Sequence, residues 1–212
     1  MAPLDSAGTH EPRATDFAPE VAWGDYLSMP DPGALRLEYE DGKLLVSPPG
    51  RNAHDSLRQI LAAWLERYEE DHPDVCLVLA EHSFCMPPGR RDYRPDVAVV
   101  CDARKDAPVP PDGWMEGAPD IAVEILSDST RARDLGLKAR RYLEEGCDEY
   151  WLLDPAARTA RFLRRGKRRW VAAAATRGVY TTPMLPGYRL ELPRLWARLD
   201  AKLRTRRPGG RR

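Results

Sequence analysis

The alternation of apolar and polar positions is clearest in the third quarter of the chain, where it predicts a strand, a helix and a second strand. Residues 121–126 (IAVEIL) form a short β-branched run, typical of a strand that is covered on both faces. Residues 127–130 (SDST) are turn sequence, and the helix that follows is expected to end near Glu145, because Gly146 is a favourable C-cap residue. Residues 150–153 (YWLL) predict the next strand, which should run parallel to the first. The apolar face of the helix is expected to carry Leu135, Ala139, Tyr142 and Leu143.

The chain before this unit predicts a hairpin, two helices and two strands. Asp41-Gly42 stands between two alternating runs, which is a strong signal for a two-residue hairpin over residues 35–47. On the first strand of that hairpin, one side is expected to carry Leu35, Leu37 and Tyr39, and the other Arg36, Glu38 and Glu40. Helical spacing of apolar residues predicts helices over residues 16–29 and 52–71, and β-rich runs predict strands over 75–84 and 94–101.

Loops and a C-terminal group of short elements complete the pattern. Residues 86–91 are a Pro/Gly turn, and residues 102–117 form a long Pro-rich loop of a kind that is more often functional or flexible than decorative. The sequence RRGKRR marks a turn between strands over 159–163 and 169–173. Further short strands are expected over 179–182 and 188–192, with a final helix over 193–204.

Length and composition then bound the class of protein. With 212 residues, 42% of them hydrophobic and 31% charged, the chain fits one globular α/β domain. We expect this domain to span residues 19–204, between a flexible segment over 1–18 and a basic disordered tail over 205–212.

The chain carries no signal for export or membrane insertion. No apolar run approaches the roughly 20 residues that a membrane span needs, and the N-terminus lacks the basic and apolar regions of a secretory signal. The cysteines, Cys76, Cys85, Cys101 and Cys147, are scattered without CxxC or Cys/His pairing. Reduced thiols and a cytoplasmic location are therefore expected, with no zinc site and no membrane partner. Lys+Arg of 33 against Asp+Glu of 33 argues against a strongly cationic nucleic-acid binder but leaves a DNA substrate open.

Three acidic residues at predicted strand positions are the strongest chemical signal. Glu124 lies inside an apolar strand, where a carboxylate is costly unless something positive meets it. Glu38 lies in the hairpin and Asp96 in the run RPDVAVV, while Lys138 lies on the helix after Glu124. Carboxylates that converge from several strands repel one another unless a cation neutralises them, and Mg²⁺ prefers such oxygen ligands together with water and phosphate. The set therefore indicates a metal-dependent site for phosphate chemistry, with Lys138 countering negative charge.

The same residues carry a resemblance to a known family. Five segments carry it: LEYEDGKLLVSPP with His54 after it, RPDVAVV, PDIAVEILSDST, the helix with Lys138 and Tyr142, and DEYWLLDP. In these segments the chain resembles the Uma-type restriction endonucleases, a branch of the PD-(D/E)XK nuclease superfamily. These segments cover roughly residues 20 to 190. The resemblance implies a restriction-endonuclease-like fold, a mixed curved β-sheet flanked by α-helices, and hydrolysis of DNA with Mg²⁺ or Mn²⁺.

The resemblance also assigns roles to residues. It implies that Asp96, Glu124 and Glu38 are the acidic, metal-binding positions and that Lys138 acts with them in catalysis. The residue two after Glu124 is Leu126, so the literal E-x-K of the superfamily is absent, and the lysine is expected to come from the following helix. Substrate contacts are expected from His54 and, at the basic turn, from Arg165, Lys167 and Arg168.

Each of these residues also has a structural interpretation. Glu38 could face solvent beside Arg36 or Lys43, Asp96 could brace the turn at Arg94-Pro95, Glu124 could form an internal ion pair, and Lys138 could pair with Asp134 on a solvated helix face. His54 could cap its helix or face solvent, and the basic turn could serve solubility alone.

Three hypotheses for function follow from the sequence. The first is a Mg²⁺-dependent endonuclease that hydrolyses DNA and that works as a monomer or a homodimer. The alternative is a catalytically silent nuclease-fold module that binds nucleic acid or protein, which the missing E-x-K favours. The third is a structural partner in a toxin or defence system, with residues 102–117 as its contact surface.

Overall fold

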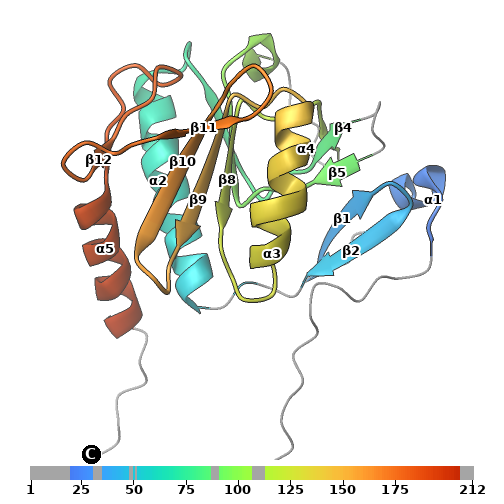
Figure 1. The fold of residues 1–212 in the computed structure, drawn as a ribbon, viewed down its shortest axis with the longest axis horizontal. Coiled ribbons are helices and arrows are strands. Elements are labelled where there is room, and N and C mark those ends of the chain that lie inside the picture. The colour runs from blue at the N-terminus through green and yellow to red at the C-terminus, as the bar shows by residue number, and fades with distance from the viewer. Residues whose placement is uncertain are drawn as a thin grey trace, which may run out of the picture.

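A computed structural model describes residues 20–30, 35–47, 50, 52–86, 91–106 and 113–205. Its largest sheet has six strands in the order β11-β10-β9-β8-β6-β3 (Figure 1). They are β3 (Leu77–Ala80), β6 (Val97–Val100), β8 (Ile121–Ile125), β9 (Glu149–Asp154), β10 (Thr159–Arg165) and β11 (Trp170–Ala173). The pair β8–β9 is parallel and the other pairs are antiparallel, so the βαβ unit predicted from the sequence is confirmed and the sheet is mixed.

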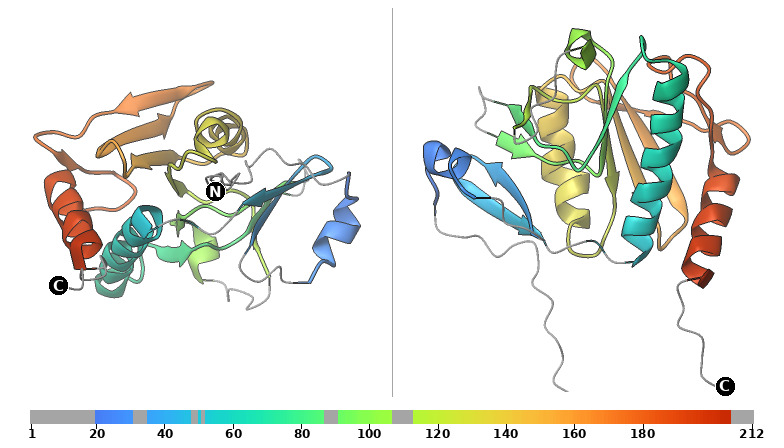
Figure 2. Two further views of the ribbon diagram at one scale, coloured as in Figure 1. Left: turned by 90° about the horizontal axis from the view of Figure 1, so that it is seen from below. Right: turned by 180° about the vertical axis from the view of Figure 1, so that it is seen from behind.

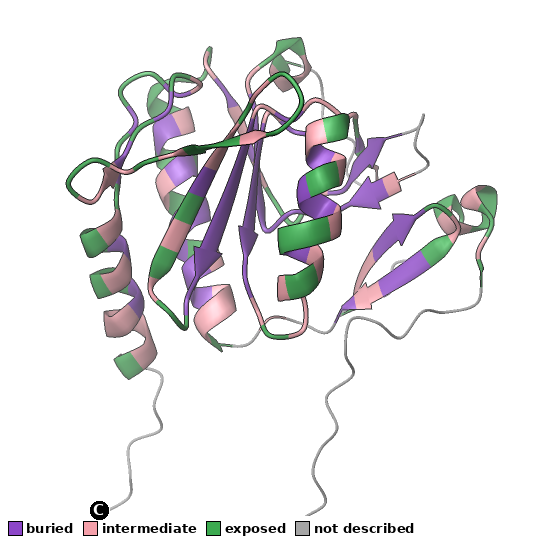
Figure 3. Cartoon of the chain, in the orientation of Figure 1, coloured by how far each residue is buried: buried purple, intermediate pink, exposed green. Residues whose placement is uncertain are grey.

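Helices cover both faces of this sheet (Figure 2). On one face α2 (Asn52–Asp71) packs beside α5 (Leu192–Thr205), and their apolar residues share one core cluster with Val123, Ile125 and Trp151. On the other face lies a continuous helical run made of α3 (Arg131–Arg133), η3 (Asp134–Lys138) and α4 (Ala139–Glu144). Its residues Ala139 and Tyr142 pack on Ala122, Tyr150 and Leu152. Two covered faces explain why β8 and β9 are buried along their whole length (Figure 3).

A second sheet lies beside the first and holds five strands in the order β2-β1-β5-β4-β7. They are β1 (Arg36–Glu40), β2 (Lys43–Ser47), β4 (Phe84–Met86), β5 (Arg91–Tyr93) and β7 (Met115–Glu116). Asp41 and Gly42 both have positive φ, as the predicted two-residue turn requires. The short helix α1 (Trp23–Leu27) packs its Trp23 and Tyr26 rings on Tyr39, so α1 and the β1–β2 hairpin form one unit.

Two short strands and a helical turn complete the described chain: η2 (Ala103–Asp106), β12 (Val179–Tyr180) and β13 (Leu190–Glu191). The buried carboxylate of Glu149 holds the segment around β12 on the main sheet. It accepts hydrogen bonds from the Trp151 indole, the Tyr180 and Thr182 hydroxyls and the Arg164 guanidinium. Because every partner is a donor, this carboxylate is satisfied within the fold and serves structure.

The α/β class, the flanking helices and the single domain are confirmed, while several element boundaries differ from the predictions. The strand predicted over 75–84 is two strands in different sheets, because the chain turns at Glu81, which has a φ of +52°. The strand predicted over 94–101 is confirmed over Val97–Val100 as β6, whereas β5, which begins at the last residue of the turn predicted over 86–91, was not expected. The helix predicted over 16–29 is confined to α1 among the described residues. The flexible segment predicted over 1–18 and all but Thr205 of the predicted tail lie outside the described residues.

The predicted apolar face of the central helix is half wrong. Ala139 and Tyr142 are inward, but Leu135 is 39% exposed, and the buried residues of the preceding turn are Asp134 and Lys138. The turn is π-helical, so the residues that precede α4 face other directions than a regular α-helical period predicts. In the part of the chain that the structure describes, no helix is long and apolar enough to cross a membrane.

Candidate active site

The register of two neighbouring strands places Asp96 opposite Glu124. Val97 at the start of β6 pairs with Val123 of β8 in an antiparallel ladder, so the residue before one lies across from the residue after the other. Directly opposite side chains on one face are roughly 5 Å apart at Cβ. The backbone N–H of Ile125 donates to Asp96 Oδ2 at 2.7 Å, which fixes the Asp96 carboxylate at the end of β8.

Lys138 lies between two of the carboxylates. Its Nζ is 2.5 Å from Glu124 Oε1 and 2.8 Å from Glu38 Oε1. The lysine is the last residue of the π-helical turn η3, which follows α3 after the end of β8, and its side chain is fully buried. The interpretation of Lys138 as a solvated partner of Asp134 is therefore wrong. Tyr142, one turn further along the same helical run, donates from its hydroxyl to Glu124 Oε1 at 3.3 Å.

Glu38 brings the β1–β2 hairpin to the same point. Its side chain is fully buried and also meets Arg133, with Nη2 at 3.0 Å from Oε2. The Arg94 backbone N–H donates to Glu38 Oε1 at 2.9 Å. The interpretation of Glu38 as solvent-exposed is wrong, because the polar face of β1 is turned toward the protein and Leu35 on the apolar side is 45% exposed.

Asp96 is neutralised from a third direction. Arg36, two residues before Glu38 on β1, donates to Asp96 Oδ1 at 2.7 Å. His54, in the first turn of α2, lies with Nε2 3.3 Å from Asp96 Oδ2. Two strands, one hairpin and two helical segments therefore supply the groups of this cluster, which no single stretch of sequence could assemble.

Burial and neighbouring charges shift the carboxyl pKa values in opposite directions. Burial alone would raise the pKa of Glu38, but Lys138, Arg133 and Arg36 outweigh it and lower the value to about 2. Asp96 also has its pKa lowered, because Arg36 and His54 outweigh its burial. For Glu124, burial together with Asp134, Asp96 and Glu38 raises the pKa to about 8 although Lys138 opposes this. Lys138 keeps its proton, because Glu124 and Glu38 raise its pKa against the effect of burial.

Formal charges in the cluster nearly cancel. Its four buried carboxylates belong to Glu38, Asp96, Glu124 and Asp134, and its three permanent cations belong to Arg36, Arg133 and Lys138. If all four carboxyl groups are ionised and His54 is neutral, one formal negative charge remains, whereas the raised pKa values of Glu124, Asp134 and His54 each favour the protonated form. Such a buried cluster is costly unless each charge meets its counterpart at close range, which the distances above provide for Glu38, Asp96 and Glu124.

Residues 23–193 match the family model of Uma2, whose description is "Putative restriction endonuclease". The chain belongs to this family. Its fold is also similar to that of a solved structure from Anabaena variabilis, titled as a "putative nuclease belonging to DUF820". The TM-score is 0.70 at 19% sequence identity, with 84% of this chain and 99% of that chain covered. No curated protein matches the chain.

The donor chemistry of this Uma2-family site fits a divalent cation at two of the three predicted ligands. Mg²⁺ is commonly bound by one or two carboxylates together with water and phosphate oxygens. Asp96 and Glu124 supply such a pair across the β6–β8 ladder. Among the described residues, no group of three or more His, Cys, Asp or Glu side chains is arranged to hold a metal ion. The metal-binding roles of Asp96, Glu124 and Glu38 all stay predictions, since each carboxylate already faces protein cations.

The predicted substrate contacts divide into two groups. His54 lies in the cluster, through Asp96. Arg165 instead pairs with Asp148 at 2.6 Å at the end of β10, and Lys167 and Arg168 are exposed in the turn between β10 and β11, away from the acidic residues. Their role in substrate binding stays a prediction.

Sequence reasoning missed Arg36 and Arg133 as members of the cluster. Arg36 carried a usable signal, because it lies two residues before Glu38 and therefore on the same face of β1. Arg133 carried no such signal in the sequence, because the direction of its side chain depends on how the helical run packs against the hairpin. Tyr142 was assigned to the core, and it is buried there, but it also reaches Glu124.

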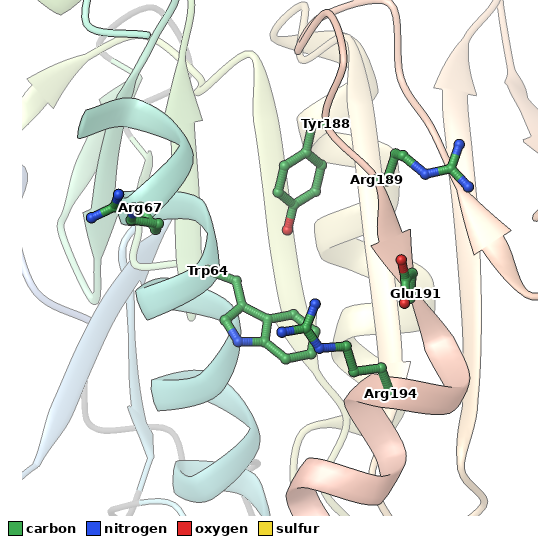
Figure 4. A pocket seen from close by; sticks show the side chains of 6 residues that line it. All are labelled: Trp64, Arg67, Tyr188, Arg189, Glu191 and Arg194. Carbon is green, nitrogen blue, oxygen red and sulfur yellow. The ribbon is translucent and has the colours of Figure 1, made fainter. Parts of the chain in front are cut away.

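A hollow of about 230 Å³ lies between α2 and the start of α5, apart from the acidic cluster. Trp64 and Tyr188 line it together with Arg67, Arg189, Glu191 and Arg194 (Figure 4). The Arg194 guanidinium lies 5.3 Å from the Trp64 ring centroid, while Arg67 and Arg189 extend away from Tyr188. Its charged groups do not converge on one point, so the cluster around Lys138 is the better candidate for an active site.

Proposed function

We propose that this protein is a metal-dependent endonuclease that hydrolyses phosphodiester bonds of DNA. Membership of the Uma2 family supports nuclease chemistry, and one geometric observation carries the proposal for this chain: the Lys138 ammonium lies between Glu38 and Glu124, and Asp96 lies across the ladder from Glu124. Two carboxylates and a lysine at one point are the groups that in-line attack of water on a phosphodiester needs.

In this proposal Asp96 and Glu124 hold Mg²⁺, with Mn²⁺ as a substitute. The bound cation would supply Lewis-acid activation of water and charge stabilisation at the phosphate. With the four carboxyl groups ionised and His54 neutral, a divalent cation would convert the one formal negative charge of the cluster into one positive charge, which the phosphodiester would neutralise. Metal binding would therefore displace the proton that the raised pKa of Glu124 favours.

The protein residues have separate tasks. Lys138 keeps Glu38 and Glu124 at fixed positions through its two contacts and places a permanent positive charge beside the reacting phosphate. Glu38 orients the attacking water or assists as a ligand, which its low pKa allows because it stays ionised. His54 and Arg36 hold the Asp96 carboxylate in place.

Cleavage of DNA by purified variants tests the proposal. The parent protein, Asp96→Asn and Glu124→Gln are incubated with supercoiled, linear, single-stranded and branched DNA in Mg²⁺, Mn²⁺ or EDTA. We expect cutting by the parent in either metal, no cutting in EDTA, and a loss of roughly 10²-fold or more in each variant.

The matched control is Glu116→Gln, which changes an exposed strand glutamate that lies outside the cluster. It should cut like the parent, and thermal unfolding should show that all variants are folded. Metal-dependent cutting that persists in a folded Glu124→Gln protein would falsify the assignment of this site.

A second candidate function is a catalytically silent module of the same fold. The observation that favours it is that Glu38, Asp96 and Glu124 each already face a protein cation and are at most 2% exposed. Calorimetric titration with Mg²⁺ and Mn²⁺ separates the two functions, because a silent site should bind neither cation in the presence or absence of DNA.

A further inference from the structure

The guanidinium of Arg133 is buried with most of its hydrogen-bond donors unused. Its side chain is 9% exposed, and Nη2 contacts Glu38 Oε2 at 3.0 Å and Ser47 Oγ at 3.2 Å. The other two nitrogens, Nε and Nη1, are buried and have no hydrogen-bond partner. Buried donors of a charged group without partners are costly, so a partner that is absent from the folded chain alone is expected there.

Unpartnered polar atoms gather around this same point. Nine buried side-chain atoms of the described residues lack a hydrogen bond, and four of them belong to Glu38, His54 and Arg133. Glu38 and His54 contact Lys138 and Asp96, so all four atoms border the proposed active site. Four of the nine unpartnered atoms therefore lie at the proposed active site.

The chemistry of Arg133 selects the kind of partner. Arginine carries five N–H donors and no acceptor, and its planar guanidinium matches the oxygens of a phosphate. Arg133 and Lys138 contact the two oxygens of one carboxylate, Glu38, so both cations stand at the same side of the cluster. A phosphate oxygen that contacts Lys138 would therefore also lie close to Arg133.

We propose that Arg133 binds a non-bridging oxygen of the substrate phosphodiester through Nε and Nη1 while Nη2 stays with Glu38. This assignment rests on the proposed nuclease function. Both partners of Nη2, Glu38 and Ser47, belong to the β1–β2 hairpin. The hairpin therefore holds the guanidinium by Nη2 and leaves Nε and Nη1 for the substrate oxygen.

The test combines a conservative variant with neutral phosphate substitutions. Arg133→Lys keeps a positive charge for Glu38 but removes the planar set of donors. Fluorescence anisotropy measures binding of a short labelled DNA, as a duplex and as a single strand, in EDTA and in Ca²⁺. In each DNA one phosphate at a time is replaced by an uncharged methylphosphonate.

We expect one methylphosphonate position to weaken binding of the parent by roughly tenfold or more, as loss of a charged hydrogen bond does. Arg133→Lys should bind the unmodified DNA more weakly by a similar factor and lose nothing further at that position, because the two changes remove the same contact. The matched control is Arg131→Lys. Arg131 lies two residues earlier in α3, pairs with Asp154 at 2.7 Å, and should follow the pattern of the parent.

Three outcomes overturn the proposal. The first is that the position-specific loss persists in Arg133→Lys, and the second is that this variant binds DNA like the parent. In both cases Arg133 only neutralises Glu38, and its Nε and Nη1 donate to an ordered water. The proposed nuclease function is then unaffected. If the parent binds neither DNA, the proposal and the DNA function fail together. Should Arg133→Lys not fold, the ¹⁵Nε–H resonance of Arg133 in the parent decides, since it should shift with unmodified DNA and not with the methylphosphonate.

Discussion

At the scale of the residue, Lys138 determines whether the buried carboxylates can exist as charges. It is the common partner of Glu38 and Glu124, and all three side chains are at most 2% exposed. Removing one partner of a buried ion pair leaves an uncompensated charge, which costs more than the pair itself contributes. The cluster is therefore a place where stability and function depend on the same atoms.

Lys138→Met tests this dependence. We expect the free energy of unfolding at a pH above the raised pKa of Glu124, where Glu38 and Glu124 are both ionised, to fall by about 3–5 kcal/mol, because both lose their shared cation. Adding Glu124→Gln to Lys138→Met should recover part of this loss, since one of the unpaired charges is then gone. Urea unfolding of the two single variants, the double variant and the parent measures the coupling.

Arg140→Met provides the control for this cycle. Arg140 lies on α4, is 60% exposed and pairs with Glu144 only at 3.8 Å, so its removal should leave stability near that of the parent. A coupling of zero between Lys138 and Glu124 contradicts the assigned contact.

At the scale of the element, the hairpin and the helical run each depend on one local feature. The hairpin needs the two positive φ values of Asp41 and Gly42, which set the register that pairs Glu38 with Leu45. The helical run needs the π turn over Asp134–Lys138, which turns Asp134 and Lys138 inward and leaves Leu135 at the surface.

Gly42→Ala tests the hairpin turn against a matched glycine. Gly42 has a φ of +91° and Gly24, inside α1, has no such strain, while an added Cβ would meet no atom within 4 Å at either position. We expect Gly42→Ala to destabilise the protein by about 1–2 kcal/mol, because a side chain disfavours left-handed backbone. Gly24→Ala should be neutral or slightly stabilising, because alanine is the better helix former. Equal effects in thermal unfolding contradict the turn geometry.

At the scale of the whole molecule, the β1–β2 hairpin is joined to the rest mainly by polar contacts. None of its residues belongs to the three apolar core clusters of the described chain. Glu40 and Asp41 instead pair with Arg91 and Arg141, while Glu38 pairs with Lys138 and Arg133. Its buried apolar residues Tyr39, Leu44 and Leu45 lie outside these clusters, and segments with fewer contacts to a packed core open at lower free energy, so we expect the hairpin to open before the core strands.

Native-state hydrogen exchange measures this difference. We expect backbone amides of β1 and β2 to exchange well before those of β8 and β9, whose residues are buried throughout. Exchange in the hairpin should accelerate with salt, because the pairs of the half-exposed Asp41 are screened, whereas the core strands should respond little. Uniform protection across hairpin and core would show that the hairpin is part of one cooperative unit.

Local pattern predicted the elements where one physical signal was dominant. The strand over residues 121–125, the helix over 52–71 and the turn at Asp41-Gly42 were each expected and are present. Each depends on near neighbours: burial on two faces, a 3.6-residue period, or a positive φ. The strand over residues 75–84 was misplaced because a single left-handed residue, Glu81, redirects the chain without any Gly or Pro to signal it.

For the active site, the sequence by itself determined which acidic residues stand at strand positions, Glu38, Asp96 and Glu124, while Lys138 was indicated by its helix position and by the family resemblance. Only the tertiary structure decided how they meet, because the β6–β8 register sets Asp96 across from Glu124 and the π turn points Lys138 at both glutamates. It also decided that Arg36 and Arg133 join them, through the packing of the hairpin against α3. The physical reason is that a local run of residues shows which charged side chain would be costly to bury. The partner that compensates its charge lies up to 100 positions away along the chain, so only the fold brings the two together.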